Sequence, residues 1–236
     1  MTTTDTSFPV DGTLLERARA VLAPRRAIRF VVGGAGTGKS TVCAEIGRRA
    51  GIPVLDVDTL LYGSWHGRFD PVRHPASHAW SAAPDLLAWQ LGLDPDAFVA
   101  FHAATTAEGL DLLADDLDAR DPDEPLLVDG GFGRPAAVAA VVSPARIACL
   151  ALPDRMLREA WTGSEERRAF LDEIASVRLT GGEDPVAAFF ALDERLHAAM
   201  VGDARGTGIA LLERDERTTV ADLVARVATA LGIDVR

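Results

Sequence analysis

The chain has 236 residues, of which 48% are hydrophobic and 25% charged, and its formal net charge is −11 at pH 7. This composition is typical of a globular protein, and the length fits a single domain spanning residues 1–236. The acidic excess argues against a nucleic-acid partner, which requires a basic surface. The longest uncharged apolar stretch, residues 135–145, is too short to span a membrane, and from the first residues we expect no secretory leader. We therefore expect a cytoplasmic protein, monomeric or homodimeric, that acts on small molecules.

The first predicted elements surround a glycine-rich loop. Residues 1–11 are expected to be disordered, residues 12–22 predict a helix, and residues 28–32 predict a short buried strand. Next comes Gly-Gly-Ala-Gly-Thr-Gly-Lys-Ser-Thr at Gly33–Thr41, which fits the pattern G-x-x-x-x-G-K-[ST]. Residues 40–50 then predict a second helix. Strand, glycine loop and helix form the context in which this pattern, the P-loop, binds phosphate.

The loop predicts a nucleotide site, because its glycines let main-chain N–H groups approach phosphate oxygens and a helix N-terminus attracts anions. Lys39 is expected to reach the β- and γ-phosphates, and the Ser40 hydroxyl to bind Mg²⁺. Lys39 is also the single lysine among 24 basic residues, which indicates that a compact ammonium group is needed there. The nucleotide-binding candidates are Gly33, Gly34, Ala35, Gly36, Thr37, Gly38, Lys39, Ser40 and Thr41.

Residues 52–58 predict a second strand whose last residues include Asp56 and Asp58. Side chains alternate along a strand, so both carboxylates are expected on the same side. The carboxyl ends of parallel strands form the edge of the sheet at which ligands bind. Asp58 is therefore a candidate for contact with a substrate, and an N-cap of the following helix is its structural alternative.

Residues 59–124 are expected to form an acceptor-binding insertion. They hold seven of the fourteen aromatic residues and four of the five histidines. Residues 64–84 are expected to be irregular, and residues 85–91 and 95–119 predict helices. An aromatic mini-core is the alternative for most of the aromatic residues. The best acceptor contacts lie in the irregular part: Trp65, Arg68 and Arg73.

The rest of the chain predicts alternating strands and helices. Strands are expected at residues 125–131, 146–152 and 208–212, and helices at residues 136–142, 155–176, 185–200 and 219–231. This alternation of apolar strands with helices indicates an α/β fold, in which a parallel sheet is covered by helices on both faces. The strand at 125–131 ends in Asp129-Gly130-Gly131. The helix at 155–176 carries Arg155, Arg158, Arg167 and Arg168.

Together with the glycine loop, Asp56-Val57-Asp58 and Asp129-Gly130-Gly131 resemble the shikimate-kinase and gluconate-kinase group of small-molecule P-loop kinases. Chloramphenicol phosphotransferase has a similar arrangement of the loop and the acidic residue. The resemblance implies a P-loop NTPase three-layer sandwich, with a five-stranded parallel sheet of order 2-3-1-4-5 and helices on both faces. It also implies a mobile lid at residues 155–180, use of ATP and Mg²⁺, and transfer of the γ-phosphate to a hydroxyl group.

The same resemblance implies roles for individual residues. Asp58 would be the base that accepts the proton of the acceptor hydroxyl, and Asp56 would hold a Mg²⁺-bound water. Asp129 is a second Mg²⁺ candidate, in the usual Walker-B place. The other candidates are Arg155 and Arg158 near the nucleotide, Arg167 and Arg168 as catalytic lid residues beside Lys39, and Gly130 and Gly131 as substrate contacts. A solvated helix face is the alternative for each arginine.

Other nucleotide-binding classes fit these residues less well. A Ras-like GTPase needs an Asn-Lys-x-Asp motif, for which no lysine remains, and a motor-type ATPase usually has Glu where this chain has Gly130. A nucleotide kinase grips phosphate with several arginines, whereas the insertion has only Arg68, Arg73 and Arg120 against twelve acidic residues. We expect an uncharged, cationic or singly anionic hydroxylated acceptor, such as a metabolite or antibiotic. A nucleoside or nucleotide kinase, a nucleotide-gated binding module and an ATPase without an acceptor remain alternatives.

Overall fold

The computed structural model describes residues 7–235. Its strands are β1 (Ile28–Gly33), β2 (Val54–Asp56), β3 (Leu126–Asp129), β4 (Ile147–Ala151) and β5 (Ala210–Glu213). They form one parallel sheet of order β2-β3-β1-β4-β5. This order confirms the predicted α/β fold class, the P-loop NTPase three-layer sandwich.

Helices cover both faces of the sheet. Their bounds are α1 (Gly12–Leu22), α2 (Lys39–Ala50), α3 (Val57–Tyr62), α4 (Pro75–Ser81), α5 (Leu86–Leu91), α6 (Pro95–Leu117), α7 (Pro135–Val141), α8 (Asp154–Thr162), α9 (Glu165–Ser176), α10 (Pro185–Thr207) and α11 (Val220–Leu231). Two short 3₁₀ helices, η1 (His66–Arg68) and η2 (Pro144–Arg146), complete the set. Within residues 7–235 no helix is both long and apolar enough to cross a bilayer.

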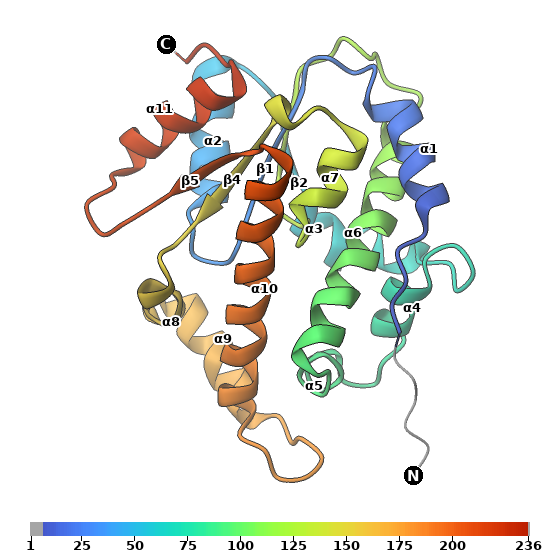
Figure 1. Ribbon diagram of the computed structural model, residues 1–236, viewed down its shortest axis with the longest axis vertical. Coiled ribbons are helices and arrows are strands. Elements are labelled where there is room, and N and C mark those ends of the chain that lie inside the picture. The colour runs from blue at the N-terminus through green and yellow to red at the C-terminus, as the bar shows by residue number, and fades with distance from the viewer. Residues whose placement is uncertain (1–6, 236) are drawn as a thin grey trace.

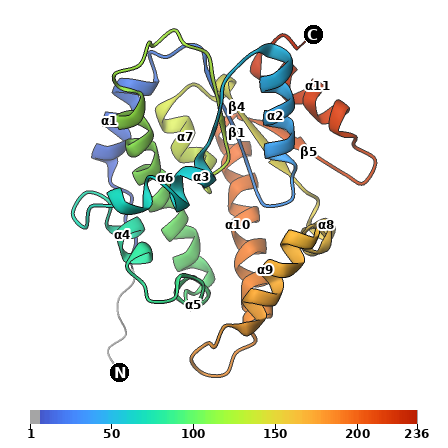
Figure 2. The ribbon, with the colours of Figure 1, turned by 180° about the vertical axis from the view of Figure 1, so that it is seen from behind.

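The alternation of side chains along β1 explains the two covered faces. Phe30 and Val32 pack in one core cluster with residues of α1, α6 and α7, whereas Val31 packs in a second cluster with α2 and α11. Figure 1 shows α2 and α11 side by side on one face, and α1, α6, α7 and α10 on the other. Figure 2 shows the same layers from behind. The three central strands β3, β1 and β4 are thus buried from both sides, as their continuous apolar sequences predict, whereas the edge strands β2 and β5 are partly exposed.

Two helical arms extend past the carboxyl ends of the strands (Figure 1). One consists of α4, α5 and the first half of α6, and the other of α8, α9 and the first half of α10. The glycine loop after β1 and the turn after β3 lie at this same edge. The arms therefore enclose the edge of the sheet at which ligands bind in parallel α/β folds.

The N-terminal expectation is wrong for the part that the structure describes. Phe8 makes edge-to-face contacts with Trp89 and Phe101, at 5.9 and 5.4 Å between ring centroids. Asp11 caps α1 by accepting from the Thr13 N–H at 2.8 Å. These contacts fix residues 7–11 against the insertion, and residues 1–6 lie outside the described part.

Three predicted boundaries are wrong for local reasons. The helix expected at 155–176 is two helices, because the chain turns at Gly163 and Ser164 caps α9. The helix expected to end at residue 200 continues to Thr207 and ends at Gly208 in the left-handed conformation. The stretch expected to be irregular contains α4, which begins with Pro75 at its first position.

The insertion is smaller than residues 59–124. Leu110 and Leu113 on α6 are fully buried in the main core, and α6 packs along α1. The second half of this helix is therefore a structural layer of the domain. The part that surrounds the ligand edge of the sheet consists of α3, α4, α5 and the first half of α6.

Candidate active site

The loop between β1 and α2 has the geometry of a phosphate cradle. Gly36 and Gly38 have φ angles of 73° and 92°, which favour glycine, and Gly38 caps α2. A side chain at Gly33 would collide with the Leu150 carbonyl of β4. Thr37 is fully buried, and its hydroxyl donates to the Gly34 carbonyl at 2.9 Å. The sequence folds this way because glycine alone allows both the turn and the close packing.

Lys39 begins α2 and extends across the loop. Its Nζ donates to the Gly34 carbonyl at 3.0 Å, and its Cε lies 3.5 Å from the position that a Cβ on Gly130 would occupy. The ammonium group therefore lies between the glycine loop and the turn after β3. From there it can exchange the carbonyl for a phosphate oxygen of a bound nucleotide without leaving the loop.

Asp129 ends β3 and is almost completely buried, with 3% of its surface exposed. Burial raises the pKa of its carboxyl, and a hydrogen bond with Ser40 opposes this change. Among the described residues, its Oδ1 atom is buried without a hydrogen-bond partner. A buried carboxylate oxygen without a partner beside a serine hydroxyl fits Mg²⁺, which takes protein oxygens together with water and phosphate.

Asp56 and Asp58 do not lie on the same strand, so the expectation that strand alternation places both carboxylates on one side is wrong. The strand ends at Asp56, and α3 begins at Val57. Asp56 is exposed and caps α3, accepting from the N–H and the hydroxyl of Thr59 at 3.2 and 2.7 Å. The capping role considered for Asp58 therefore belongs to Asp56. The two side chains that lie together as Mg²⁺ candidates are those of Ser40 and Asp129.

Asp58 lies in the first turn of α3 and faces the loop. Gly130 has a φ angle of 69°, which favours glycine, and the Oδ2 of Asp58 lies 2.8 Å from the position that a Cβ on Gly130 would occupy. Asp58 keeps exposed surface on the open cavity. Partial desolvation is nevertheless the largest effect on its pKa and raises it, and the charge of Lys39 opposes this. Asp56 and Asp129 raise the pKa further, and a hydrogen bond from the Gly131 N–H lowers it. This is the environment of a carboxylate whose proton affinity is increased.

A cavity of about 310 Å³ opens directly beside these groups. Gly33, Gly34, Ala35 and Lys39 form one wall, and Asp58 lies on the same cavity. The remaining lining side chains come from α3 to α6, the loop after β3, α8 and α10. Gly131 lines the cavity, and Gly130 lies behind it next to Asp58 and Lys39. Aromatic and aliphatic groups make up most of the lining, among them Tyr62, Trp80, Phe101, Phe132 and Met200.

The predicted acceptor contacts Trp65, Arg68 and Arg73 do not line this cavity, so this prediction is wrong. Trp65 is fully buried, and its Nε1–H donates to Asp116 at 2.7 Å. Arg68 pairs with the same carboxylate at 2.6 Å. The aromatic mini-core is the correct interpretation for Trp65, since a residue without exposed surface has no contact with a ligand.

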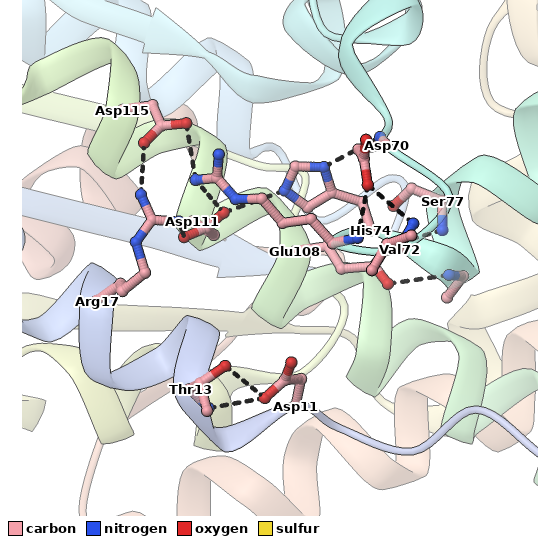
Figure 3. Close-up of polar contacts among 12 residues, drawn as sticks. Asp11, Thr13, Arg17, Asp70, Val72, His74, Ser77, Glu108, Asp111 and Asp115 are labelled. Carbon is pink, nitrogen blue, oxygen red and sulfur yellow. Dashed lines mark hydrogen bonds and ion pairs between the residues drawn. The ribbon is translucent and has the colours of Figure 1, made fainter.

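Arg73 belongs to a charge network between α4, α6 and α1. Asp111 on α6 is fully buried and accepts from Arg17 at 2.9 Å, from His74 at 3.0 Å and from Arg73 at 2.5 Å. Figure 3 shows Asp111 between Arg17 and His74. Glu108, one turn earlier, accepts from the N–H groups of Ala76 and Ser77 at the start of α4. The network therefore fixes α4, whose Ser77 and Trp80 line the cavity.

Replacing Asp111 by Ala should lower the free energy of unfolding by about 2–3 kcal/mol, because three charged or polar partners lose a buried acceptor. Chemical denaturation would measure the change. Asp115→Ala is the matched control, since Asp115 contacts Arg17 and Arg73 from a half-exposed position and should cost less than about 1 kcal/mol. Equal losses for the two variants would show that burial of Asp111 is not the cause.

The four predicted arginines have different environments. Arg167 donates to the Ala160 carbonyl at 2.8 Å, and its Nη1 lies 3.2 Å from the position of a Cβ on Gly36. Arg168 donates to the Thr162 carbonyl. Arg155 pairs with Glu216, and Arg158 pairs with Glu194 and lies over the Phe190 ring. Of the four, Arg167 is the one that the described contacts place against the glycine loop.

Several residues of the site were not predicted. Arg214 follows β5 and donates to the Gly36 carbonyl at 2.9 Å. Its position directly after a strand, at the ligand edge, is a signal that sequence analysis could have used. Asp193 and His197 on α10 and His102 on α6 line the cavity. No local pattern marks these three, because tertiary packing alone brings α6 and α10 to the loop.

The sheet order, the glycine loop between β1 and α2 and the cavity at the carboxyl edge define the P-loop NTPase fold. No protein-family model and no curated protein matches the sequence. The chain is similar to solved structures over most of its length. The structure of TT1252 from Thermus thermophilus has 19% identity and a TM-score of 0.45, and covers 86% of this chain and 95% of that one.

Two further structures carry descriptions of function. A shikimate kinase from Acinetobacter baumannii in complex with shikimate has 17% identity and a TM-score of 0.46, and covers 91% of this chain and 97% of that one. A sugar kinase from Janibacter sp. HTCC2649 has 13% identity and a TM-score of 0.39, and covers 87% and 94%. At these values the likeness does not transfer a substrate or a reaction. The similarity to chloramphenicol phosphotransferase stays a prediction.

Proposed function

We propose that this protein is an ATP-dependent phosphotransferase that moves the γ-phosphate of ATP to a hydroxyl group of a small molecule. One observation carries the proposal: the glycine loop with Lys39 and the carboxylate of Asp58 border the same cavity. A nucleotide on the loop and an acceptor in the cavity would be neighbours. Phosphoryl transfer depends mainly on such positioning and on stabilisation of charge.

Each residue then has a defined task. The loop N–H groups and Lys39 bind the β- and γ-phosphates, and Ser40 and Asp129 would hold Mg²⁺, which neutralises charge on the phosphates when bound. Asp58 accepts the proton of the acceptor hydroxyl. The hydroxyl oxygen forms a bond to the γ-phosphorus, the bond between the γ-phosphorus and the β–γ bridging oxygen breaks, and ADP leaves. The raised proton affinity of the Asp58 carboxylate favours this step.

The experiment has two separate readouts. Calorimetry would measure the binding of Mg²⁺ and ATP, and mass spectrometry would detect ATP-dependent phosphorylation in a screen of hydroxylated metabolites and antibiotics. Nucleotide binding together with a phosphorylated product supports the proposal. Binding without any product favours the nucleotide-gated module, and ADP release that no acceptor accelerates favours an ATPase. Absence of nucleotide binding would refute all three.

We expect residues 165–182 to exchange backbone hydrogen more slowly when Mg²⁺ and a non-hydrolysable ATP analogue are bound. The reason is that Arg167 of α9 lies against Gly36, so phosphates on the loop gain a cation from this segment. Hydrogen-exchange mass spectrometry with and without the analogue would measure it. The same comparison in Lys39→Ala is the control, and equal exchange in both states of the unmodified protein would contradict a lid.

A further inference from the structure

The side chains around the cavity carry more negative than positive charge. Within residues 7–235, Lys39 is the only lysine or arginine that lines it, whereas Asp58 and Asp193 both do. His102 adds no charge near neutral pH, because burial and the charge of Arg134 lower its pKa to about 4. With Lys39 committed to phosphate, an anionic acceptor would meet the γ-phosphate without a counter-charge.

The arginines of the insertion and of the loop after β3 are held by acidic partners, whereas Arg167 and Arg214 donate to carbonyl groups at the glycine loop, where the nucleotide phosphates would bind. Arg68 and Arg73 of the insertion pair with carboxylates of α6, and Arg120 pairs with Glu124. Arg134, which acts on His102, forms two hydrogen bonds with Asp203 at 2.7 and 2.8 Å. Binding of a carboxylate or phosphate on the acceptor would require one of these pairs to break.

Asp193 is the acidic residue on the cavity that has no role in the proposed phosphoryl transfer. The Trp161 Nε1–H donates to its Oδ2 at 3.0 Å and so fixes the orientation of the carboxylate. On the same helix, Glu194 pairs with Arg158 and Asp203 with Arg134. Among the described residues Asp193 has no salt bridge with an arginine or lysine, and it lies on the cavity. Burial raises the pKa of this carboxyl, and the Trp161 hydrogen bond and the neighbouring His197, which lines the same cavity, oppose the rise.

The remaining walls suit a cation with an apolar body. Tyr62, Trp80, Phe101 and Phe132 line the cavity. Aromatic faces attract ammonium groups, and the attraction is stronger where water is excluded. Hydrogen-bonding groups on the walls, such as Ser77, Gln90 and Thr105, can bind further hydroxyl groups of the same ligand.

We propose that the phosphoryl acceptor is a compact hydroxylated amine, whose ammonium group binds Asp193 while one hydroxyl faces Asp58. The inference rests on the proposed function and narrows its substrate class. Asp58 comes from α3 and Asp193 from α10, so two separate elements engage the two ends of the molecule. Neutral and anionic acceptors lack an ammonium group that could pair with the Asp193 carboxylate.

The test uses triplets of fragments in which the same ring carries a cationic, a neutral or an anionic group. One triplet is 4-aminocyclohexanol, cyclohexane-1,4-diol and 4-hydroxycyclohexanecarboxylate, and another is glucosamine, glucose and glucuronate. Binding is measured by ligand-observed NMR and calorimetry with Mg²⁺ and a non-hydrolysable ATP analogue present. Each amine that binds should do so about 10- to 100-fold more tightly than its neutral and anionic partners, as expected for a hydrogen-bonded charge pair.

Asp193→Asn should remove this preference, because asparagine can still accept from Trp161 but carries no charge. Asp193→Glu, which restores the charge, should recover part of it. Asp118→Asn removes one exposed acidic charge at the end of α6 and should leave the preference unchanged. Thermal melting verifies that the variants fold. The inference is wrong if no amine binds, if the diols or carboxylates bind equally well, or if Asp193→Asn retains the preference.

These outcomes are separate from those of the proposed function. One outcome supports the phosphotransferase and contradicts the amine acceptor. In it, Lys39→Ala loses ATP binding and the unmodified protein transfers phosphate to a neutral or anionic acceptor. The opposite outcome is preferential binding of amines without any phosphoryl transfer. It would support amine binding at Asp193 and contradict the phosphotransferase activity.

Discussion

Lys39→Ala should reduce ATP-dependent turnover by on the order of 10³-fold and leave the fold intact. The loss is large because the ammonium group stabilises charge on the transferred phosphoryl group, where one well-placed donor is worth about 10²–10³-fold or more. The stability change should stay within about 1 kcal/mol, because the described contact of Nζ is one hydrogen bond to the Gly34 carbonyl. Steady-state kinetics and thermal melting measure the two quantities.

Arg158→Ala is the matched control for the loss of a positive charge. Arg158 is largely exposed and pairs with Glu194 outside the glycine loop, so its removal should change turnover much less. Unchanged turnover in Lys39→Ala would rule out the phosphotransferase. A fall in turnover accompanied by unfolding would assign Lys39 a structural task instead.

Asp58→Asn should lower kcat by about 10²–10⁴-fold, the usual cost of removing a general base. ATP affinity should change little, because Asp58 faces the acceptor cavity. The raised pKa also fixes the sign of the stability change. A carboxyl whose pKa is higher in the folded state stabilises the fold below its unfolded pKa, and this contribution is lost as pH rises through the folded pKa. Because Asp58 keeps exposed surface, solvent screens this effect, and Asp58→Asn should leave the melting temperature nearly unchanged.

Asp56→Asn is a close control, because it removes the same charge two residues away and asparagine also caps helices. It should retain most of kcat. Equal losses in both variants would show that the acidic field, and not proton transfer at Asp58, supports turnover. In the unmodified protein, kcat should fall as pH decreases through a pKa above 3.8, the ordinary value for this carboxyl.

The parallel sheet and the glycine loop could be predicted because each depends on short segments. Five apolar runs that alternate with helices indicate a parallel sheet, and one nine-residue motif marks the loop. The order of the strands was predicted from the resemblance to the P-loop kinases. The end of β2 was missed for a local reason. Asp56 is both the last residue of the strand and the N-cap of α3. The alternation of side chains along a strand does not show where the following helix begins.

The walls of the cavity were predictable only in part. Trp65 and Arg73 lie in an aromatic and basic segment, but acidic residues of α6, some forty to fifty positions later, engage them. Asp193 and His197 lie on a helix far from the motif in sequence and look like ordinary helix residues. Their role depends on how α10 packs against the loop, and no short pattern in the sequence encodes that packing.

Helix α10 is continuous over 23 residues, so it connects distant parts of the molecule rigidly. Near its start Phe189 packs on Trp161 and Phe170 of the α8–α9 arm, its middle carries His197, and Asp203 clamps its far half to Arg134. Because the helix is unbroken between these contacts, the cavity wall and the α8–α9 arm are attached to the same rigid element. A displacement of either one is therefore transmitted to the other.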